Sequence, residues 1–574
     1  MGVRINLIGP PEIRVNDAPA TIRGHKPWAV LARILLSDRP LGRQYLAAEV
    51  FPEAEDPLGA LRWSLAELRR GVQDPGSFTG DPVVASLPSG TDVDAWELAE
   101  GLLDVDDAGS LLDGVNPSCS PGFESWLLIE RERTASAIDG LLRRRIIEAQ
   151  SLGDHGRAVT LAQQAVSRRP FDEGTHVLLV KALVGAGRQD TALQHVANTE
   201  QLFITELGVE PSSALREAAR AKAADRAPGV SADAAARALL DAGRAAVDAG
   251  AAGAGMECLR RAVAEAEYAD RHLQAMTLFE LGTALVHAVR GFDDEGAVLL
   301  QQAVDLAIAA GDAVLAAQAT RELAYTDALV GRRPTAAVYL DQGLSLAGDD
   351  TSALAGLQAV RAFNLAEWGR LEEGLRAYEE AIELARSVGN PRRQAWALGL
   401  GARAQLLGGE PDEARRWLVE SLDLTEREGW ISFRPWPVAL LGEVRLTTGE
   451  TGETVLADLE HSFALSCQLG DPCWEGASAR AIALCHLATG EPEAAWRWIR
   501  EARVRCTRES DTYAGMDASI LATEAELAAQ RGEEPAADAA ARSLLTLAAR
   551  THQDGFARYA LRLLGLSDPS VATP

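Results

Sequence analysis

The segments GRLEEGL (369–375) and GEPDEAR (409–415) begin about 40 residues apart. They share one pattern, a glycine followed within a few residues by acidic side chains. Glycine commonly ends a helix, and acidic side chains favour the first turn of the next helix because the helix dipole is positive there. Similar turns recur at nearly constant intervals between amphipathic segments: GAAG (250–253), GFDDEGA (291–297), GRRPTAA (331–337), GETGET (449–454), GEPEAAW (490–496) and GEEPAAD (532–538). This periodicity predicts stacked helix–turn–helix units that form an α-solenoid.

The repeat units resemble tetratricopeptide repeats, although they are longer than the usual ~34 residues of that repeat. An Ala-rich, charged stretch with Pro228-Gly229 at its centre precedes them and marks a domain boundary. We expect a linker over 226–238, about eight tetratricopeptide-like repeats over 239–566 and a tail over 567–574.

The amino-terminal part combines short β-type runs with helical patterns. VRINLI (3–8) and EIRV (12–15) surround a Gly-Pro-Pro turn, VVASL (83–87) is a third expected strand, and the helical stretches lie at 26–37, 42–51 and 56–72. From Asp92 onward the pattern is almost entirely helical. The predicted fold class is therefore mainly α, with a small α/β domain over 1–90, a helical domain over 91–225 and the α-solenoid.

Composition limits the classes of partner. The 574 residues carry 56 basic and 83 acidic side chains, a formal net charge of −27, so most of the surface should repel phosphate. The segment 22–72 is an exception, with eight basic and six acidic side chains. The six cysteines are scattered, which argues against a zinc site, and we expect no cofactor. No apolar run has the length of a signal peptide core or a membrane helix, which predicts a cytoplasmic protein without membrane contact.

Three features together resemble the SARP-type regulators, which carry the bacterial transcriptional activator domain. They are the element order of an OmpR-type winged helix over 1–90, the helical run FESWLLIERERTASAIDGLL (123–142), and LGVEPSSALREA (207–218), which is similar to the closing signature of that domain. The resemblance implies double-stranded DNA as a partner, bound by the third helix in the major groove. It also implies transcription activation with RNA polymerase as a partner, and a homodimer.

The stretch DPLGALRWSLAELRRGV (56–72) is the expected recognition helix. Leu61, Leu65 and Leu68 recur at helical spacing and should face a core, while Glu67 is expected within the polar arc. Arginine and lysine supply phosphate and base-edge contacts, and tryptophan can stack. The predicted DNA-binding residues are Arg62, Trp63, Arg69, Arg70, Lys26 and Arg23. The alternative is a degenerate winged helix, kept for packing, in a scaffold or ligand-binding protein; Glu67 and an abridged wing favour it.

Tryptophans are concentrated in the solenoid and suggest a second site. Trp396, Trp436 and Trp474 recur at nearly the spacing of the repeats, close to the expected start of each first helix, and GWISFRPWP (429–437) is the least repeat-like segment. An aromatic ladder beside arginine could bind a peptide, a protein or a small-molecule effector. The candidate groove residues are Trp396, Trp436, Trp474, Trp430, Arg434 and Arg393. The alternative is core packing, since tryptophan is a consensus residue of these repeats.

Enzyme motifs are missing from the sequence. It contains no G-x4-G-K-[ST] phosphate-binding loop, no G-x-S-x-G and no H-E-x-x-H. The chain is therefore expected not to be an enzyme.

Overall fold

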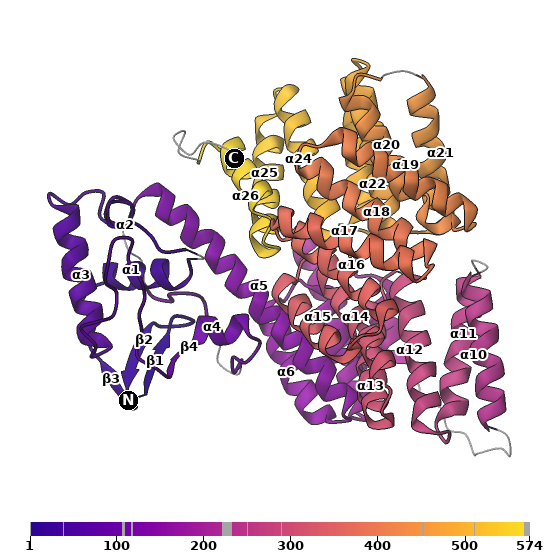
Figure 1. The fold of residues 1–574 in the computed structure, drawn as a ribbon, viewed down its shortest axis with the longest axis horizontal. Helices are drawn as coiled ribbons and strands as arrows, with labels where there is room; N and C mark the ends of the chain where they lie inside the picture. The colour runs from indigo at the N-terminus through magenta and orange to yellow at the C-terminus, as the bar shows by residue number, and fades with distance from the viewer. Residues whose placement is uncertain are drawn as a thin grey trace. The chain divides into compact units, whose positions relative to one another are not determined.

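The computed structural model describes residues 2–37, 39–105, 109–115, 119–220, 232–248, 251–288, 290–450, 453–509 and 511–566 (Figure 1). The chain divides into two compact units, one made of Met1–Leu141 with Ala557–Pro574 and the other of Leu142–Phe556. A small sheet lies in the first unit, and the rest of both units is dominated by helices, which confirms the predicted mainly α class. The expected tail over 567–574 lies outside the described residues.

The sheet has the order β3-β2-β1-β4, with β1 antiparallel to β2 and parallel to β4. Alternate residues such as Val3, Ile5 and Ile13 point into the core, as expected of strands with one buried face. Asp94, which follows β4, accepts the backbone N–H groups of Leu7 and Ile8 and so fastens the end of β4 to β1. The strands are β1 (Val3–Asn6), β2 (Glu12–Val15), β3 (Ala18–Ala20) and β4 (Thr91–Val93).

The prediction of a strand at VVASL (83–87) is wrong. Within it, Val83 and Val84 make only isolated bridges, to Leu41 and Thr79 respectively, and the strand that joins the sheet is β4. Pro82 and Pro88 flank the segment and lack the N–H groups that extend a ladder. The predicted short wing is thus a tight reversal over 79–84.

Helices α1 (Lys26–Leu35), α2 (Arg43–Val50) and α3 (Pro57–Gly71) match the three predicted helices and are followed by the short α4 (Asp94–Ala99). Asp56 caps α3 by accepting the Gly59 N–H at 2.8 Å, and Pro57 occupies the first turn, where a missing N–H costs nothing. Leu31 of α1, Leu46 of α2 and Leu65 of α3 are fully buried in one core with the sheet.

Five helices form the region of the predicted activator domain: α5 (Pro121–Ser151), α6 (His155–Arg168), α7 (Glu173–Gly185), α8 (Gln189–Leu207) and α9 (Ser213–Arg220). The stretch LGVEPSS closes this bundle. Gly208 ends α8 in the left-handed conformation, and the Glu173 carboxylate accepts both the N–H and the hydroxyl of Ser212. The signature segment therefore turns the chain back so that α9 packs against α7.

The repeats alternate first and second helices: α10 (Ala232–Asp248), α11 (Ala252–Ala266), α12 (Arg271–His287), α13 (Asp293–Ala310), α14 (Ala313–Leu329), α15 (Arg333–Ala347), α16 (Thr351–Glu367), α17 (Leu371–Ser387), α18 (Pro391–Leu407), α19 (Pro411–Arg427), α20 (Pro435–Thr447), α21 (Glu453–Leu469), α22 (Pro472–Ala488), α23 (Pro492–Cys506), α24 (Ala514–Gln530), α25 (Glu534–Arg550) and α26 (Asp554–Leu563). Seven of the eight predicted turn glycines adopt φ between 73° and 87°: Gly291, Gly331, Gly369, Gly409, Gly449, Gly490 and Gly532. This left-handed backbone favours glycine and explains its recurrence.

Two predictions made from the sequence concern residues that lie partly outside the described ones. The eighth turn, GAAG (250–253), begins at Gly250, which lies outside them. Of the predicted linker, residues 226–231 also lie outside them, whereas 232–238 belong to α10. The alanine that suggested a linker is a strong helix former, so the helix begins inside the predicted linker.

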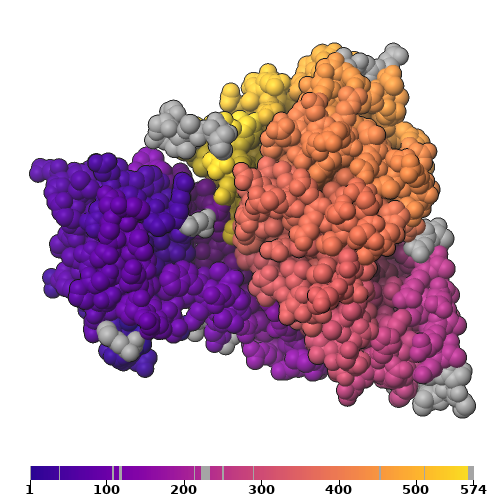
Figure 2. Space-filling view, in the orientation of Figure 1, coloured from indigo at the N-terminus to yellow at the C-terminus, as the bar shows by residue number. Residues whose placement is uncertain are grey.

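Repeats that are distant in the sequence meet inside the second unit. Arg403 of α18 pairs with Glu367 of α16 and donates to the carbonyl of Gly515 in α24 at 2.7 Å. Arg290, after α12, pairs with Asp471, which caps α22. The inner surface of the superhelix is therefore partly filled by its own side chains. In Figure 2 the repeats coloured from magenta to orange lie against one another on the face that is drawn.

Candidate functional site

Helix α3 presents an amphipathic surface of the predicted kind. Leu61, Leu65 and Leu68 are buried in the core. Arg62 and Trp63 lie on the opposite face, where the Trp63 side chain is 49% exposed and that of Arg62 is 61% exposed. Arg62 forms an ion pair with Asp56, but both side chains are exposed, so solvent screens this pair.

Glu67 does not lie in the polar arc, in contrast to the sequence expectation. Its side chain is buried; Oε1 accepts the backbone N–H of Arg23 at 3.1 Å, and Oε2 pairs with Arg70. Gly71 lets the segment before α1 approach α3 closely, because a Cβ at Gly71 would clash with Ile22. This close approach brings in the backbone N–H of Arg23, which needs a hydrogen-bond acceptor, and Glu67 supplies that acceptor. The Glu67 carboxylate, which argued against DNA binding in the sequence, therefore points into the domain.

The remaining predicted DNA-binding residues have different surroundings. Arg70 stays 62% exposed despite its contact with Glu67, and the exposed Arg23 lies beside the same carboxylate. Arg69 donates to the backbone carbonyls of Ser77 and Phe78, at 2.9 and 2.7 Å. Lys26 donates to the carbonyl of Val50 at 2.9 Å. Arg62, Trp63 and Arg70 therefore form the accessible surface, whereas Arg69 and Lys26 hold backbone segments.

The sequence interpretation missed Arg43, which fixes the wing. Its Nε donates to the carbonyl of Gly80 at 2.7 Å, and its backbone N–H donates to Asp81. Together with Arg69, which holds Ser77 and Phe78, it attaches the start of the wing to α2 and α3. Nothing in the local pattern around Arg43 distinguishes it from a solvated arginine, since α3 separates it from its partners along the chain.

The predicted groove residues separate into buried and accessible groups. Trp436 is fully buried, and its indole N–H donates to the carbonyl of Gly399 at 3.0 Å. It therefore packs in the core and does not face a groove. Trp396, Trp430 and Trp474 are half-buried, and Trp430 stacks on Phe433 with ring centroids 4.8 Å apart.

The two predicted groove arginines differ as well. Arg434 is exposed just before α20, whereas Arg393 is half-buried and donates to the carbonyl of Ser352 at 2.6 Å. Trp396, Trp436 and Trp474 lie near the starts of α18, α20 and α22, as their spacing predicted.

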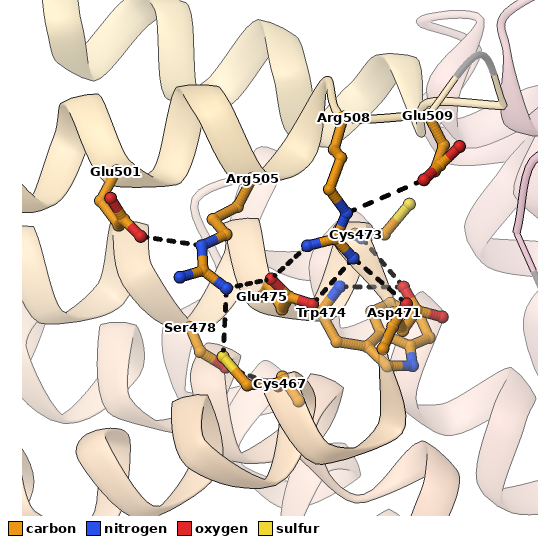
Figure 3. Close-up of polar contacts among 12 residues, drawn as sticks. Cys467, Asp471, Cys473, Trp474, Glu475, Ser478, Glu501, Arg505, Arg508 and Glu509 are labelled. Carbon is orange, nitrogen blue, oxygen red and sulfur yellow. Dashed lines mark hydrogen bonds and ion pairs between the residues drawn. The ribbon is translucent and has the colours of Figure 1, made fainter. Parts of the chain in front are cut away.

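A polar cluster next to Trp474 fastens α22 to α23 (Figure 3). Glu475 is buried and accepts from Arg505 at 2.8 Å and from Arg508 at 3.0 Å, while Asp471 accepts the backbone N–H of Trp474. Arg505 also reaches Cys467, but burial raises the pKa of that thiol, which disfavours the reactive thiolate. The cluster is a structural one, and its partners on different helices are too far apart in the chain to form a sequence motif.

Comparisons with known proteins match two regions of this architecture. Residues 97–221 match the family model of the bacterial transcriptional activator domain, and residues 356–427 match a tetratricopeptide repeat model. The chain therefore contains a bacterial transcriptional activator domain followed by tetratricopeptide repeats. The resemblance inferred from the closing signature and the repeat period is confirmed.

One curated relative is regulatory protein AfsR of Streptomyces coelicolor, 28% identical over 245 residues. That match covers 38% of this chain and 24% of the relative, so the chain spans only about a quarter of the relative's length in the match.

Solved structures give weaker likenesses. EmbR of Mycobacterium tuberculosis, in complex with a low-affinity phosphopeptide, has a TM-score of 0.29 at 17% identity, covering 38% of this chain and 64% of that one. Aspartyl phosphate phosphatase F of Bacillus subtilis has a TM-score of 0.38 at 11% identity, covering 71% and 93%. A signal-transduction ATPase with a tetratricopeptide sensor from Pyrococcus horikoshii has 0.36 at 13% identity, covering 94% and 64%. These scores carry no functional inference.

Two negative findings apply to the described part of the chain. None of its helices combines the length and the apolar character needed to cross a bilayer. No group of three or more His, Cys, Asp or Glu side chains in it is arranged to hold a metal ion.

Proposed function

We propose that this SARP-type chain is a transcription regulator of the activator type that binds double-stranded DNA through α3. The observation that carries the proposal is the orientation of Glu67, whose buried carboxylate leaves Arg62, Trp63 and Arg70 as an outward surface. Arg62 and Arg70 would contact phosphates or base edges, and Trp63 would pack against the sugar–phosphate backbone or a thymine methyl.

The charge balance of the chain supports a local interface. A surface with net charge −27 repels DNA over most of its area, so affinity would depend on few phosphate contacts and would fall steeply with salt. The wing is short and would add little contact. Binding through α3 alone favours paired copies, and the homodimer implied by the family would supply the second contact.

The other parts of the chain would supply control. The activator domain would contact RNA polymerase, and the tetratricopeptide region would bind an effector or recruit a partner. Such a ligand must bind one arrangement of the chain better than another, because equal affinity for both shifts no equilibrium. The proposed role is non-enzymatic and cytoplasmic.

The test compares retention of the full-length chain on mixed-sequence duplex DNA at low salt with that of Arg62→Ala/Arg70→Ala. Loss of two phosphate contacts should lower the elution salt and reduce the salt slope by about two. The matched control is Arg427→Ala/Arg542→Ala, which removes two arginines of similar exposure from the solenoid. Equal retention of the α3 variant and the control would favour the scaffold alternative, in which the winged helix only packs.

A further inference from the structure

Two guanidinium groups from neighbouring first helices lie over the same glycine. A Cβ built at Gly356 of α16 would lie 2.7 Å from Nη1 of Arg321, in α14, and 3.0 Å from Cζ of Arg393, in α18. Glycine thus leaves the space that the two cations share. Like charges held this close in a half-buried place repel each other unless negative charge lies nearby.

The protein supplies too little negative charge for this pair. Glu322 contacts Arg321 through Oε1, but its other oxygen already contacts His287 at 2.7 Å. In the described part of the chain no carboxylate pairs with Arg393, whose guanidinium donates to the Ser352 carbonyl. Burial lowers the pKa of Arg393, and burial together with the charge of Arg393 lowers the pKa of Arg321 to about 9. Their surroundings therefore disfavour positive charge on both arginines.

Aromatic rings border the arginine pair. Tyr325 lies one turn after Arg321 on α14, and Trp396 lies one turn after Arg393 on α18. The Trp396 ring is 6.1 Å from that of Tyr325 and 6.2 Å from that of Phe363, between centroids. Trp396 is half-buried, so part of this residue remains accessible one helical turn from Arg393.

We propose that Arg321 and Arg393 bind the carboxylate or phosphate group of a small organic anion, whose apolar body packs on Trp396. Guanidinium groups bind such oxyanions through paired, charge-assisted hydrogen bonds, and a ligand site typically combines a few polar groups with an apolar wall. The site deepens the effector role proposed above for the tetratricopeptide region, because it specifies the chemical class of the effector.

The test measures binding of phenyl phosphate, benzoate and inorganic phosphate to the full-length chain by calorimetry, at constant ionic strength and without DNA. We expect saturable binding of at least one aromatic anion, tighter than that of inorganic phosphate. Arg393→Gln should weaken it about tenfold or more, as expected from loss of a charged hydrogen bond. Arg386→Gln removes a half-exposed arginine of α17 and should leave binding unchanged.

The remaining outcomes separate the parts of the proposal. Binding of phenyl phosphate alone supports a phosphate effector, and binding of benzoate alone supports a carboxylate. No saturable binding of any probe, or equal affinity of Arg393→Gln and Arg386→Gln, overturns the site. Gly356→Ala keeps both charges but forces them apart, and it should weaken binding even if Arg393→Gln does not fold. Retention on DNA is a separate measurement, so failure here is distinguishable from failure of the DNA-binding proposal.

Discussion

Arg143 of α5 and Asp327 of α14 form a buried ion pair, with Nη1 3.0 Å from Oδ1. The Nε of the same guanidinium donates to Asp294 of α13 at 2.7 Å. Arg143 lies within the activator-domain match, whereas both acids belong to the repeats. A single arginine therefore joins the two regions inside one compact unit, and Lys181 with Glu295 adds a second, longer pair, 3.7 Å between Nζ and Oε2.

Arg143→Ala should destabilise the second unit strongly. Removing one partner of a buried ion pair typically costs about 3–5 kcal/mol. Here Asp327 would keep its pair with Arg332, whereas Asp294 would lose the arginine that contacts it directly. Thermal unfolding followed by circular dichroism measures the loss. Arg427→Ala, which removes an exposed arginine, is the control and should change stability by no more than about 0.5 kcal/mol. Equal melting of the two variants would contradict a structural role for Arg143.

Asp293 and Asp294 are adjacent in the chain but should respond to pH in opposite ways. Burial and the nearby Asp511 raise the pKa of Asp293 well above its usual value, although Arg290 and Arg143 oppose this. Burial would also raise the pKa of Asp294, but Arg143, Arg332 and Lys181 outweigh it and lower that pKa. Both oxygens of Asp293 lack a hydrogen-bond partner in the described part of the chain.

Asp293→Asn should therefore raise the unfolding temperature near neutral pH. The folded state holds a proton on Asp293 that the unfolded state has lost, so this residue's contribution to stability falls as pH rises above 3.8 and through the raised pKa. Asparagine does not titrate, so the variant does not lose this contribution to stability as pH rises. Asp294→Asn should do the opposite, because the stability from its depressed pKa is present at neutral pH and is lost only as pH falls through that pKa. Melting curves between pH 5 and 8 that move the same way for both variants would refute this assignment.

Glu67→Gln should reduce stability without strengthening DNA binding. The carboxylate accepts the Arg23 amide and contacts Arg70 inside the domain, and weakening these charged hydrogen bonds should cost about 1–3 kcal/mol. A carboxylate that faced the duplex would instead give tighter retention at low salt when neutralised. Elution salt on duplex DNA, measured beside the melting temperature, distinguishes the two. Retention that rises without loss of stability would place Glu67 at the interface.

Arg69→Ala and Arg70→Ala should have separable effects although the residues are neighbours. Arg69 holds the carbonyls of Ser77 and Phe78, so its loss should free the wing and speed amide hydrogen exchange over 79–84. Arg70 is exposed and should affect retention on DNA more than wing exchange. Hydrogen exchange followed by mass spectrometry measures the first effect. Identical exchange in the two variants would show that Arg69 does not hold the wing.

Trp436→Ala should unfold the central repeats instead of removing a ligand contact. The indole is fully buried and hydrogen-bonded to Gly399, and truncating such a side chain typically costs about 3–5 kcal/mol. Trp63→Ala, at an exposed indole on α3, is the matched control and should leave the melting temperature nearly unchanged. If Trp436→Ala kept its stability, the core-packing role would be contradicted and Trp436 would again be a candidate for ligand contact in the groove.

Local pattern was sufficient for the elements of this fold and for their order. The recurring turn glycines mark left-handed backbone, and Leu61, Leu65 and Leu68 mark the buried face of α3, because both follow from the geometry of one or two helical turns. The strand expected at 83–87 failed because pairing requires a partner strand, which the pattern of one segment cannot reveal.

Orientation and pairing, in contrast, depended on segments far apart in the chain. Helical spacing placed Glu67 in a polar arc, but the close approach at Gly71 brought the Arg23 amide to it and turned its charge inward. Packing between stacked repeats buried Trp436 and brought Arg321 and Arg393 over Gly356. The sequence alone determined the helices, their turns and the acidic surface, because these depend on nearest neighbours and composition. Only the tertiary structure decided which charged and aromatic side chains are accessible, because burial depends on contacts between residues that are remote from one another in the sequence.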